Sequence, residues 1–252
     1  MSADRTGPSA ARPSVARTAV VWDALRDVLG DVQGGLDRVA SVVDFGGGTG
    51  GFAVRVAELG HRVTVVDPSP DALAILARRA EESGVAGLVS GRQGDLASLL
   101  DLVPAGSADV LLCHGVLEIV DDPAATLRIL AQALRPGGVL SLLVNQRHAA
   151  VVARAMAGHF GQALALLDAA PDAASGAGRR FAAEEVIALL GSTGFDTTAL
   201  HAVRVFADLV PSSLVELEPG SAAALVELEK AVAPRPEYLP LAAQLHLLAH
   251  LP

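Results

Sequence analysis

The 252-residue sequence has only one cysteine, Cys113, and aromatic residues make up only 3% of the chain. A single cysteine excludes an intramolecular disulfide, so nothing in the sequence indicates an oxidising compartment. No apolar run reaches the length of a membrane span, and the N-terminus lacks the apolar segment of a secretory signal. We therefore expect a cytoplasmic protein that makes no contact with a membrane.

Lysine is also scarce, because Lys230 is the only one and every other basic residue is an arginine. The formal net charge of −9 argues against a protein that wraps nucleic acid non-specifically, while a local basic face remains compatible with it. Hydrophobic residues, in contrast, make up 51% of the chain. This composition and length suit one α/β domain with a sizeable core and an insertion or short appendage.

Strand-like and helix-like segments alternate along most of the sequence, and this alternation predicts a parallel sheet covered on both faces. Ser69-Pro70 and Asp122-Pro123 are typical helix caps. Residues 1–13 lack periodicity and predict a flexible N-terminal arm, so that the domain spans 14–252. The predicted strands are 39–44, 62–66, 85–89, 108–113 and 139–144. The predicted helices are 15–29, 51–59, 70–82 and one that begins at 123.

The alternation breaks after the fifth strand. Residues 149–167 form a long apolar helical stretch, and 168–178 are rich in Ala, Gly, Ser and Pro. We interpret 148–180 as a helical lid inserted over the site. Beyond it lie a helix at 182–190, strand candidates at 195–206 and 239–251, and between these an acidic helical segment at 214–231.

A glycine-dense turn, Val-Val-Asp44-Phe-Gly46-Gly47-Gly48-Thr-Gly50, joins the first strand to the next helix. Glycines let the backbone approach a ligand closely. Asp44 stands just before them, and a pyrophosphate gains nothing from a carboxylate beside free N–H groups. A cationic ligand is a better match, and S-adenosylmethionine (SAM) carries positive charge on its sulfonium and amino groups.

Polar residues follow several of the predicted strands, at the sheet edge where parallel α/β proteins bind ligands. Asp67 is placed to accept both ribose hydroxyls of a nucleoside, which NAD would also supply. Asp95 could accept from an adenine amino group while Leu96 packs on the ring. His114 would border the transferred methyl, and Arg17 could hold a carboxylate bidentately.

The acceptor side of the site is less clearly marked. A sulfonium is an activated electrophile, so alignment can supply roughly 7–11 kcal/mol of the barrier and no catalytic base is assigned. If the acceptor is a carboxylate, it needs a cation. Arg147 and Arg204 are the candidates, with His148 as a further donor, and no metal site is predicted.

Several segments resemble the bacterial tRNA 5-carboxymethoxyuridine methyltransferases, which are class I SAM-dependent enzymes. The similarity spans roughly residues 14–250, and Arg17 and Trp22 match the family's early Arg and Trp. It implies that the protein forms a methyl ester on a carboxymethoxy group of a wobble uridine, with release of S-adenosyl-L-homocysteine (SAH). The segments that carry it are 113–123 (CHGVLEIVDDP), 134–143 (LRPGGVLSLL), 157–160 (AGHF), 203–208 (VRVFAD), 225–229 (LVELE) and 236–238 (PEY).

The sequence therefore predicts a Rossmann-like seven-stranded class I methyltransferase sheet whose last strand runs antiparallel. Its acceptor oxygen belongs to a modified tRNA base or a small metabolite. Alternatives are an N- or C-methyltransferase, an NAD(P)-dependent oxidoreductase, for which only Tyr238 could be the catalytic tyrosine, and a non-catalytic SAM-binding protein. The predicted cofactor-binding residues are Arg17, Asp44, Gly46, Gly47, Gly48, Gly50, Asp67, Pro68, Gln93, Gly94, Asp95, Leu96 and His114.

Overall fold

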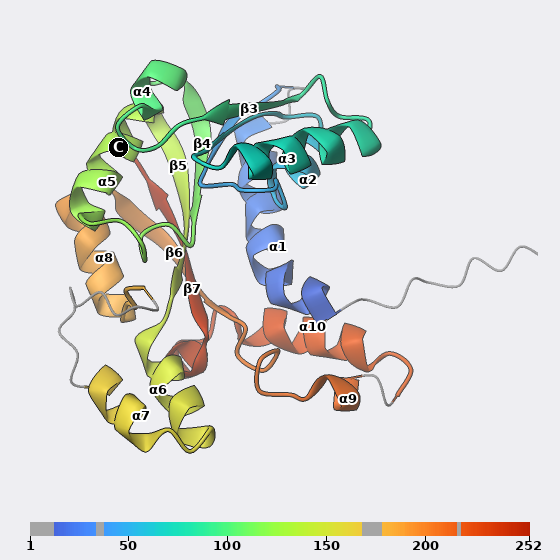
Figure 1. Cartoon of the computed structure of the whole chain (residues 1–252), viewed down its shortest axis with the longest axis vertical. Coiled ribbons are helices and arrows are strands. Elements are labelled where there is room, and N and C mark those ends of the chain that lie inside the picture. Colours follow the sequence, from blue (N-terminus) through green and yellow to red (C-terminus); the bar gives the residue numbers. More distant parts are fainter. Residues whose placement is uncertain (1–12, 34–37, 168–177, 216–217) are drawn as a thin grey trace, which may run out of the picture.

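The computed structural model describes residues 13–33, 38–167, 178–215 and 218–252. Within them, seven strands form one sheet in the order β3-β2-β1-β4-β5-β7-β6 (Figure 1). All neighbouring strands run parallel except β7, which is antiparallel to both β5 and β6, as the sequence predicted. The strands are β1 (Ser41–Phe45), β2 (Arg62–Asp67), β3 (Val89–Gln93), β4 (Ala108–His114), β5 (Leu134–Asn145), β6 (Asp196–Val203) and β7 (Gln244–His250).

Helices cover both faces of this sheet (Figure 1). On one face α1 (Pro13–Gln33), α2 (Ala53–Glu58) and α3 (Pro70–Glu82) bury a cluster that includes Leu25, Val56 and Leu76. On the other face α5 (Pro123–Ala133) and α8 (Ala183–Ser192) bury a second cluster around Leu127 and Val186, close to the short α4 (Leu99–Leu102). The central strands are apolar on both sides because each side is covered.

The predicted helix caps are present. The Ser69 side chain accepts a hydrogen bond from the Ala72 N–H at 3.2 Å, with Pro70 as the first helical residue of α3. Asp122 does the same for α5, accepting from the Ala125 N–H at 2.9 Å. Each cap satisfies an N–H that the helix itself leaves unpaired. The starts of these two helices, which follow the ends of β2 and β4, were thus predicted correctly.

The third predicted strand was wrong in position. Residues 85–88 form the turn that ends α3, in which the Val85 N–H donates to the Ala80 carbonyl at 2.8 Å and Gly84 has φ +71°. The strand follows at Val89–Gln93 and pairs with β2. Valine and leucine at 85–89 mimic a strand, but a helix that ends at Gly84 needs these residues for its C-terminal turn.

Two long helical predictions were also wrong, because a glycine at positive φ divides each segment. Residues 149–167 form α6 (Arg147–Met156) and α7 (Phe160–Leu167), separated at Gly158, which has φ +77°. The acidic segment 214–231 divides into α9 (Ser212–Val215) and α10 (Ser221–Val232), with Gly220 at φ +93° before α10. The last predicted strand begins late, because a 3₁₀ helix, η1 (Pro236–Leu241), precedes β7.

Two predictions fall largely on residues outside those described. The proposed arm, 1–13, lies outside them except for Pro13, which is the first residue of α1. The loop of the proposed lid, 168–178, lies outside them except for Gly178. In the described part, α6 and α7 extend beyond the carboxyl-terminal edge of the parallel strands (Figure 1). Within the described residues, no helix combines the length and apolar character needed to cross a bilayer.

Gly50 provides a test of the turn that follows β1. It has φ +77°, and a Cβ there would lie 2.1 Å from Leu76 Cδ1. Left-handed backbone costs an L-residue about 1–2 kcal/mol and overpacking about 1–3 kcal/mol, so we expect Gly50→Ala to lower the free energy of unfolding by about 2–5 kcal/mol. Urea denaturation would measure it.

Gly51 is the matched control, because a Cβ added there would meet no other atom within 4 Å and its φ is not positive. Gly51→Ala should change stability by less than about 1 kcal/mol. Equal effects of the two substitutions would contradict this description of the turn.

Candidate active site

The glycine turn is packed so tightly that side chains are excluded from it. The Gly46 N–H donates to the Val66 carbonyl at 2.8 Å, which closes the turn against β2. A Cβ on Gly46 would lie 2.5 Å from Val116 Cγ2, and one on Gly47 would lie 2.5 Å from the Asp44 carboxyl carbon. Gly46 and Gly48 also have positive φ, at +73° and +53°. The turn therefore brings bare backbone to the ends of β1 and β4.

Asp44 lies beneath this turn with only 3% of its surface exposed. Burial, reinforced by the negative charge of Asp67, raises the pKa of Asp44 to about 7. A carboxylate in such a position is costly unless a cation compensates it. A cationic ligand for Asp44 stays a prediction, and the burial of this carboxyl is compatible with it.

Asp67 is held at the end of β2 by two backbone N–H groups. Its Oδ2 accepts from Gly48 and its Oδ1 from Ser69, each at 2.9 Å. These bonds fix the carboxylate plane, and each oxygen retains a further lone pair. Asp67 remains at the surface of a cavity, so it can still accept from two hydroxyl groups.

That cavity has a volume of about 590 Å³ and opens over the ends of β1, β2 and β4. Small-molecule sites typically measure about 300–1,000 Å³. Of the predicted cofactor residues, Gly46, Asp67, Pro68, Asp95, Leu96 and His114 line it. Asp44, Gly47, Gly48 and Gly50 form or support the turn behind it, and Gln93 and Gly94 lie at the end of β3 beside Pro68 and Asp67.

Sequence reasoning missed the apolar wall of this cavity. Val116, Ile119 and Val120, from the loop after β4, line it together with Asp67 and Pro68. The apolar residues that follow His114-Gly115 directly in the sequence could have predicted this wall. Asp95 is fully exposed at the rim, where it accepts from the Ser98 N–H at 3.1 Å and Ser98 lowers its pKa. Cys113 is fully buried in the core and is inert there, because burial raises the pKa of its thiol.

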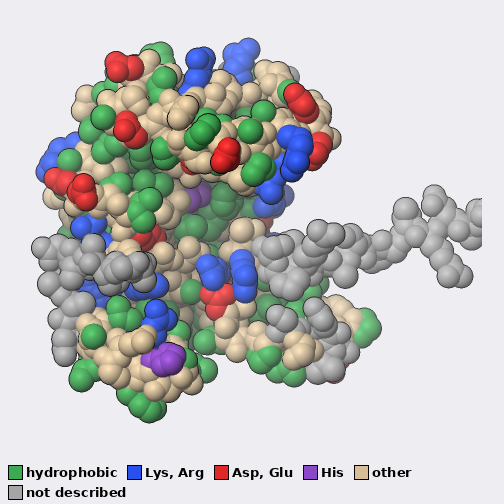
Figure 2. Space-filling view, in the orientation of Figure 1, with side chains coloured by type: hydrophobic (Ala, Val, Ile, Leu, Met, Phe, Trp, Pro, Cys, Tyr) green, Lys and Arg blue, Asp and Glu red, His purple; other side chains and the backbone are tan. Residues whose placement is uncertain are grey.

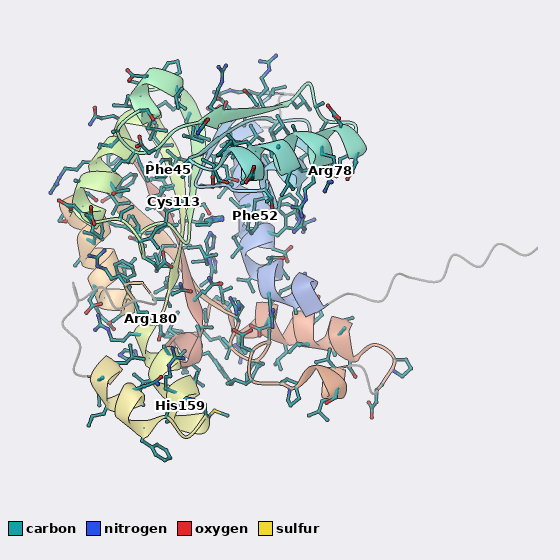
Figure 3. All side chains as sticks on the ribbon, in the orientation of Figure 1. Phe45, Phe52, Arg78, Cys113, His159 and Arg180 are labelled. Carbon is teal, nitrogen blue, oxygen red and sulfur yellow. The ribbon has the colours of Figure 1, made fainter. Side chains whose placement is uncertain are left out.

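A second cavity, of about 250 Å³, lies at the same edge of the sheet over the ends of β5 and β6. Three arginines line it: Arg154 from α6, Arg180 from the segment before α8, and Arg204 from the end of β6. Burial and the nearby Arg154 lower the pKa of Arg180, and Glu118 opposes this effect. Figure 2 shows basic side chains gathered below the central hollow, and Arg180 is labelled in Figure 3 between α8 and α6.

Arg204 is fixed in an unusual backbone conformation. It has φ +60°, the only positive φ among the described non-glycine residues. Its guanidinium donates to Gln244 at 3.3 Å and to Asp208 at 2.5 Å, while its buried Nε has no partner among the described residues. Strained backbone and an unpaired buried donor are both uncommon in structural residues and frequent at functional sites.

The other predicted acceptor and carboxylate-binding residues lie elsewhere. Arg147 is paired with both oxygens of Glu185 at 2.9 Å and does not line the cavity, so its charge is already compensated. His148 is exposed on the first turn of α6 and does not line the cavity either. Arg17 pairs with Asp208 at 3.3 Å, which ties α1 to the rim of the second cavity.

Glu118 and Arg179 connect the loops around the two cavities. Glu118 accepts a hydrogen bond from the Asn145 N–H at 2.7 Å, which holds the end of β5 against the loop after β4. The Arg179 guanidinium donates to the carbonyls of Leu117, Val120 and Asp121 in the same loop. The wall of the larger cavity is thereby fixed to the segment that carries Arg180.

Comparison with known proteins agrees with this arrangement. A model of the methyltransferase domain family matches residues 43–142. The Escherichia coli tRNA 5-carboxymethoxyuridine methyltransferase is 30% identical over 239 residues, 94% of this chain and 88% of that one. A ubiquinone biosynthesis O-methyltransferase from Xanthomonas axonopodis is 38% identical over 121 residues, 47% of this chain and 48% of that one.

Solved structures support the same fold. A SAM-dependent methyltransferase from Mesorhizobium loti aligns with a TM-score of 0.57 at 20% identity over 93% of this chain and 99% of that one. The magnesium protoporphyrin IX methyltransferase from Synechocystis, solved with bound SAH, aligns with a TM-score of 0.59 at 16% identity over 94% of this chain and 86% of that one.

The fold and the acid-lined cavity are those of a class I methyltransferase. The chain belongs to the family of SAM-dependent methyltransferases that includes the E. coli tRNA 5-carboxymethoxyuridine methyltransferase. SAM is its cofactor, and the residues present suit that molecule. The larger cavity offers carboxylates, which can accept hydrogen bonds and compensate positive charge, and apolar side chains, on which an adenine can pack. The family assignment excludes the alternative of an NAD(P)-dependent oxidoreductase. Tyr238, the tyrosine considered for that alternative, packs on Phe206 and does not line the larger cavity.

We expect SAM binding to depend on pH, because burial raises the pKa of Asp44 and SAM is a cation. Below about pH 7 the Asp44 carboxyl is protonated in the free protein, and binding a cation must first remove that proton. Affinity is lost as the pH falls, and we expect the Kd of SAM to be more than about tenfold weaker at about pH 5.5 than at about pH 7. Calorimetry at both values would measure it.

Asp44→Asn keeps the shape of the side chain but cannot ionise. Its Kd for SAM should be weaker than wild type at neutral pH and nearly constant over the same range. An undiminished pH dependence in the Asn variant would assign the titration to another group.

Proposed function

We propose that this methyltransferase forms a methyl ester on a carboxylate-bearing acceptor that Arg154, Arg180 and Arg204 hold at the edge of the sheet. The convergence of these three arginines on one small cavity carries the proposal. Arg204 and Arg154 come from separate elements, and neither Arg154 nor Arg180 has an ion-pair partner among the described residues. An anion is the ligand that would compensate such a cluster.

The chemistry of transfer suits a carboxylate. A carboxylate oxygen is already an anion, so it attacks the methyl of the sulfonium without first losing a proton. The guanidinium groups would hold the acceptor in line with the methyl, and such alignment contributes roughly 7–11 kcal/mol. Asn145 lines the acceptor cavity and His114 the cofactor cavity, on adjacent strands, which supports direct transfer between the two.

For the cofactor itself, we propose that Asp67 accepts the ribose hydroxyls, Asp95 and Leu96 receive the adenine, and Asp44 compensates the positive charge. The glycine backbone at 46–50 would contact the methionine part. Arg17 reaches the same edge from α1, where it pairs with Asp208. It would enter the site by leaving Asp208 and binding the methionine carboxylate instead. Arg154 on α6 supports a lid role for the α6–α7 pair.

The acceptor we favour is the carboxymethoxy group of a modified uridine in tRNA. The support is the 30% identity to a methyltransferase of that name across 94% of this chain, far beyond the cofactor-binding part. A small carboxylate metabolite is the second candidate, favoured by the net charge of −9, because phosphate backbones attract proteins through basic surfaces.

Labelled SAM separates these candidates. The enzyme would be incubated with labelled SAM and either bulk tRNA or a small-molecule extract, and each product then treated with mild base. Base-labile label in tRNA supports the first candidate, and base-labile label only in the extract replaces it with the second. Label that survives base in both fractions would contradict a methyl ester.

Substitution of the cavity arginines tests the acceptor site. A hydrogen bond to a charged group contributes about 1.5–3 kcal/mol, so Arg154→Gln and Arg204→Gln should each lower kcat/KM for the acceptor by about tenfold to a hundredfold. The Kd of SAM, measured by calorimetry, should change much less.

Arg78→Gln is the matched control, because Arg78 is an exposed arginine on α3 whose guanidinium lies 3.6 Å from Glu82 and away from both cavities (Figure 3). It should leave kcat/KM near wild type. An equal loss in all three variants would point to general electrostatics rather than to a binding site.

A further inference from the structure

Three histidines and one serine lie in a single row across four adjacent strands. His114 of β4 is opposite Leu143 of β5, Leu143 is opposite His246 of β7, and His246 is opposite His201 of β6. Ser141 lies two residues before Leu143, so its side chain is on the same face of the sheet. This face is the one that α1 and α2 cover.

Hydrogen bonds join these four side chains, which we call the histidine row, without a break. His114 Nε2 lies 2.9 Å from Ser141 Oγ, and Ser141 Oγ lies 2.8 Å from His246 Nε2. His246 Nδ1 lies 3.2 Å from His201 Nδ1, and the two rings are stacked with centroids 5.4 Å apart. Ser141 and His246 are completely buried.

The two ends of the histidine row differ in their surroundings. His114 lines the cofactor cavity, and its Nδ1 is buried without a partner among the described residues. The ring of Phe52, the residue before α2, packs on the His114 ring in a T-shaped arrangement with centroids 4.9 Å apart. His201 is partly exposed, and Asp27 of α1 is the charged group that faces it. A buried nitrogen without a partner, on a residue that lines a ligand cavity, is a group that a bound molecule can satisfy.

All three imidazoles are neutral near pH 7. Burial lowers the pKa of His114 to about 4 and lowers the pKa of His246 well below its ordinary value, with His114 and His201 adding to the effect on His246. Burial also lowers the pKa of His201, which Asp27 opposes. Each ring therefore carries one hydrogen on one of its two nitrogens.

These hydrogens can be distributed in only two ways. The Ser141 hydroxyl has one hydrogen to donate, so of the His114 and His246 Nε2 atoms one donates and the other accepts. The His246 ring carries one hydrogen, so its Nδ1 donates when its Nε2 accepts, and its Nδ1 accepts when its Nε2 donates. In the first arrangement His114 Nδ1 is a free acceptor and His201 Nε2 carries a hydrogen. In the second, His114 Nδ1 carries the hydrogen and His201 Nε2 is free.

The geometry points to a proton relay: we propose that the histidine row removes the proton of a hydroxyl acceptor at His114 Nδ1 and releases one to solvent from His201 Nε2. The site would then methylate phenol- or enol-type hydroxyls as well as carboxylates. This activity goes beyond the methyl-ester formation proposed above, which needs no base.

The transfer balances in protons and electrons. An oxygen lone pair of the acceptor forms the O–CH₃ bond as the C–S⁺ bond of SAM breaks and its electron pair returns to sulfur, which gives SAH. The acceptor proton passes to His114 Nδ1, and three internal shifts move a proton from His114 Nε2 through Ser141 and His246 to His201 Nδ1. His201 Nε2 releases its proton to solvent. After the product leaves, the row resets when His114 Nδ1 gives its proton to water, the three internal shifts reverse and His201 Nε2 takes up one proton from solvent.

Nuclear magnetic resonance can test the coupling without any acceptor. In the full chain with ¹⁵N-labelled histidine and bound SAH, the pH would be lowered from about 8 until the ¹⁵N shifts of the partly exposed His201 show that its ring has become charged. A charged His201 must donate from Nδ1, which forces the second arrangement and places the hydrogen of His114 on Nδ1. Ser141→Ala should abolish this response at His114 and preserve it at His246. A His114 tautomer that is independent of His201 in the wild type, or that follows it equally in Ser141→Ala, would overturn the relay.

Single-turnover transfer from labelled SAM tests the activity with two probes, catechol as a hydroxyl acceptor and phenoxyacetate as a carboxylate acceptor. General base assistance contributes about 10²–10⁴-fold, so Ser141→Ala should lower the catechol rate at least about tenfold more than the phenoxyacetate rate. Ser192→Ala, on the exposed end of α8, is the matched control and should not change that ratio.

The two proposals fail separately in this assay. Transfer to catechol but not to phenoxyacetate would support the relay and contradict the carboxylate acceptor. Transfer to phenoxyacetate with none to catechol, or an equal effect of Ser141→Ala on both, would overturn the relay and leave the carboxylate acceptor intact.

Discussion

The carboxyl group of Asp44, enclosed beneath a turn of glycines, is the constraint on which the site depends. Burial beside Asp67 makes its charge unfavourable in the free protein. We propose that a cation bound at the turn removes that penalty, so that the cofactor supplies an interaction that the protein cannot satisfy alone. The glycines at 46 and 47 are required for the same reason, because side chains there would collide with Val116 and with Asp44 itself.

Much of the fold was readable from local signals. The caps at Ser69 and Asp122 fixed two helix starts, and acids at strand ends located the ligand-binding edge. What failed was the choice between local alternatives. Residues 85–88 look like a strand but complete the end of α3, and Gly158 and Gly220 interrupt apolar or acidic runs whose periodicity is otherwise helical. Tertiary packing decides such cases.

The cofactor side of the site was more predictable than the acceptor side. Its residues follow strands within one half of the chain, in an order that parallel topology brings to one edge. Arg154, Arg180 and Arg204 instead meet from three separate segments. The sequence contains nearly all its positive charge as arginine, so residue type does not distinguish Arg204 from Arg147, which Glu185 compensates. The histidine row could not be foreseen either, because it depends on the register of four strands.

The two cavities share the carboxyl-terminal edge of the sheet, and the loop after β4 supports both. Glu118 and Arg179 hold that loop against the end of β5 and against the segment that carries Arg180. The most direct test of the central claim is a crystal structure with SAH. The ribose hydroxyls should bond to Asp67, and the amino group should lie beside Asp44 at the glycine turn. SAH bound elsewhere, or at this edge without either contact, would contradict it.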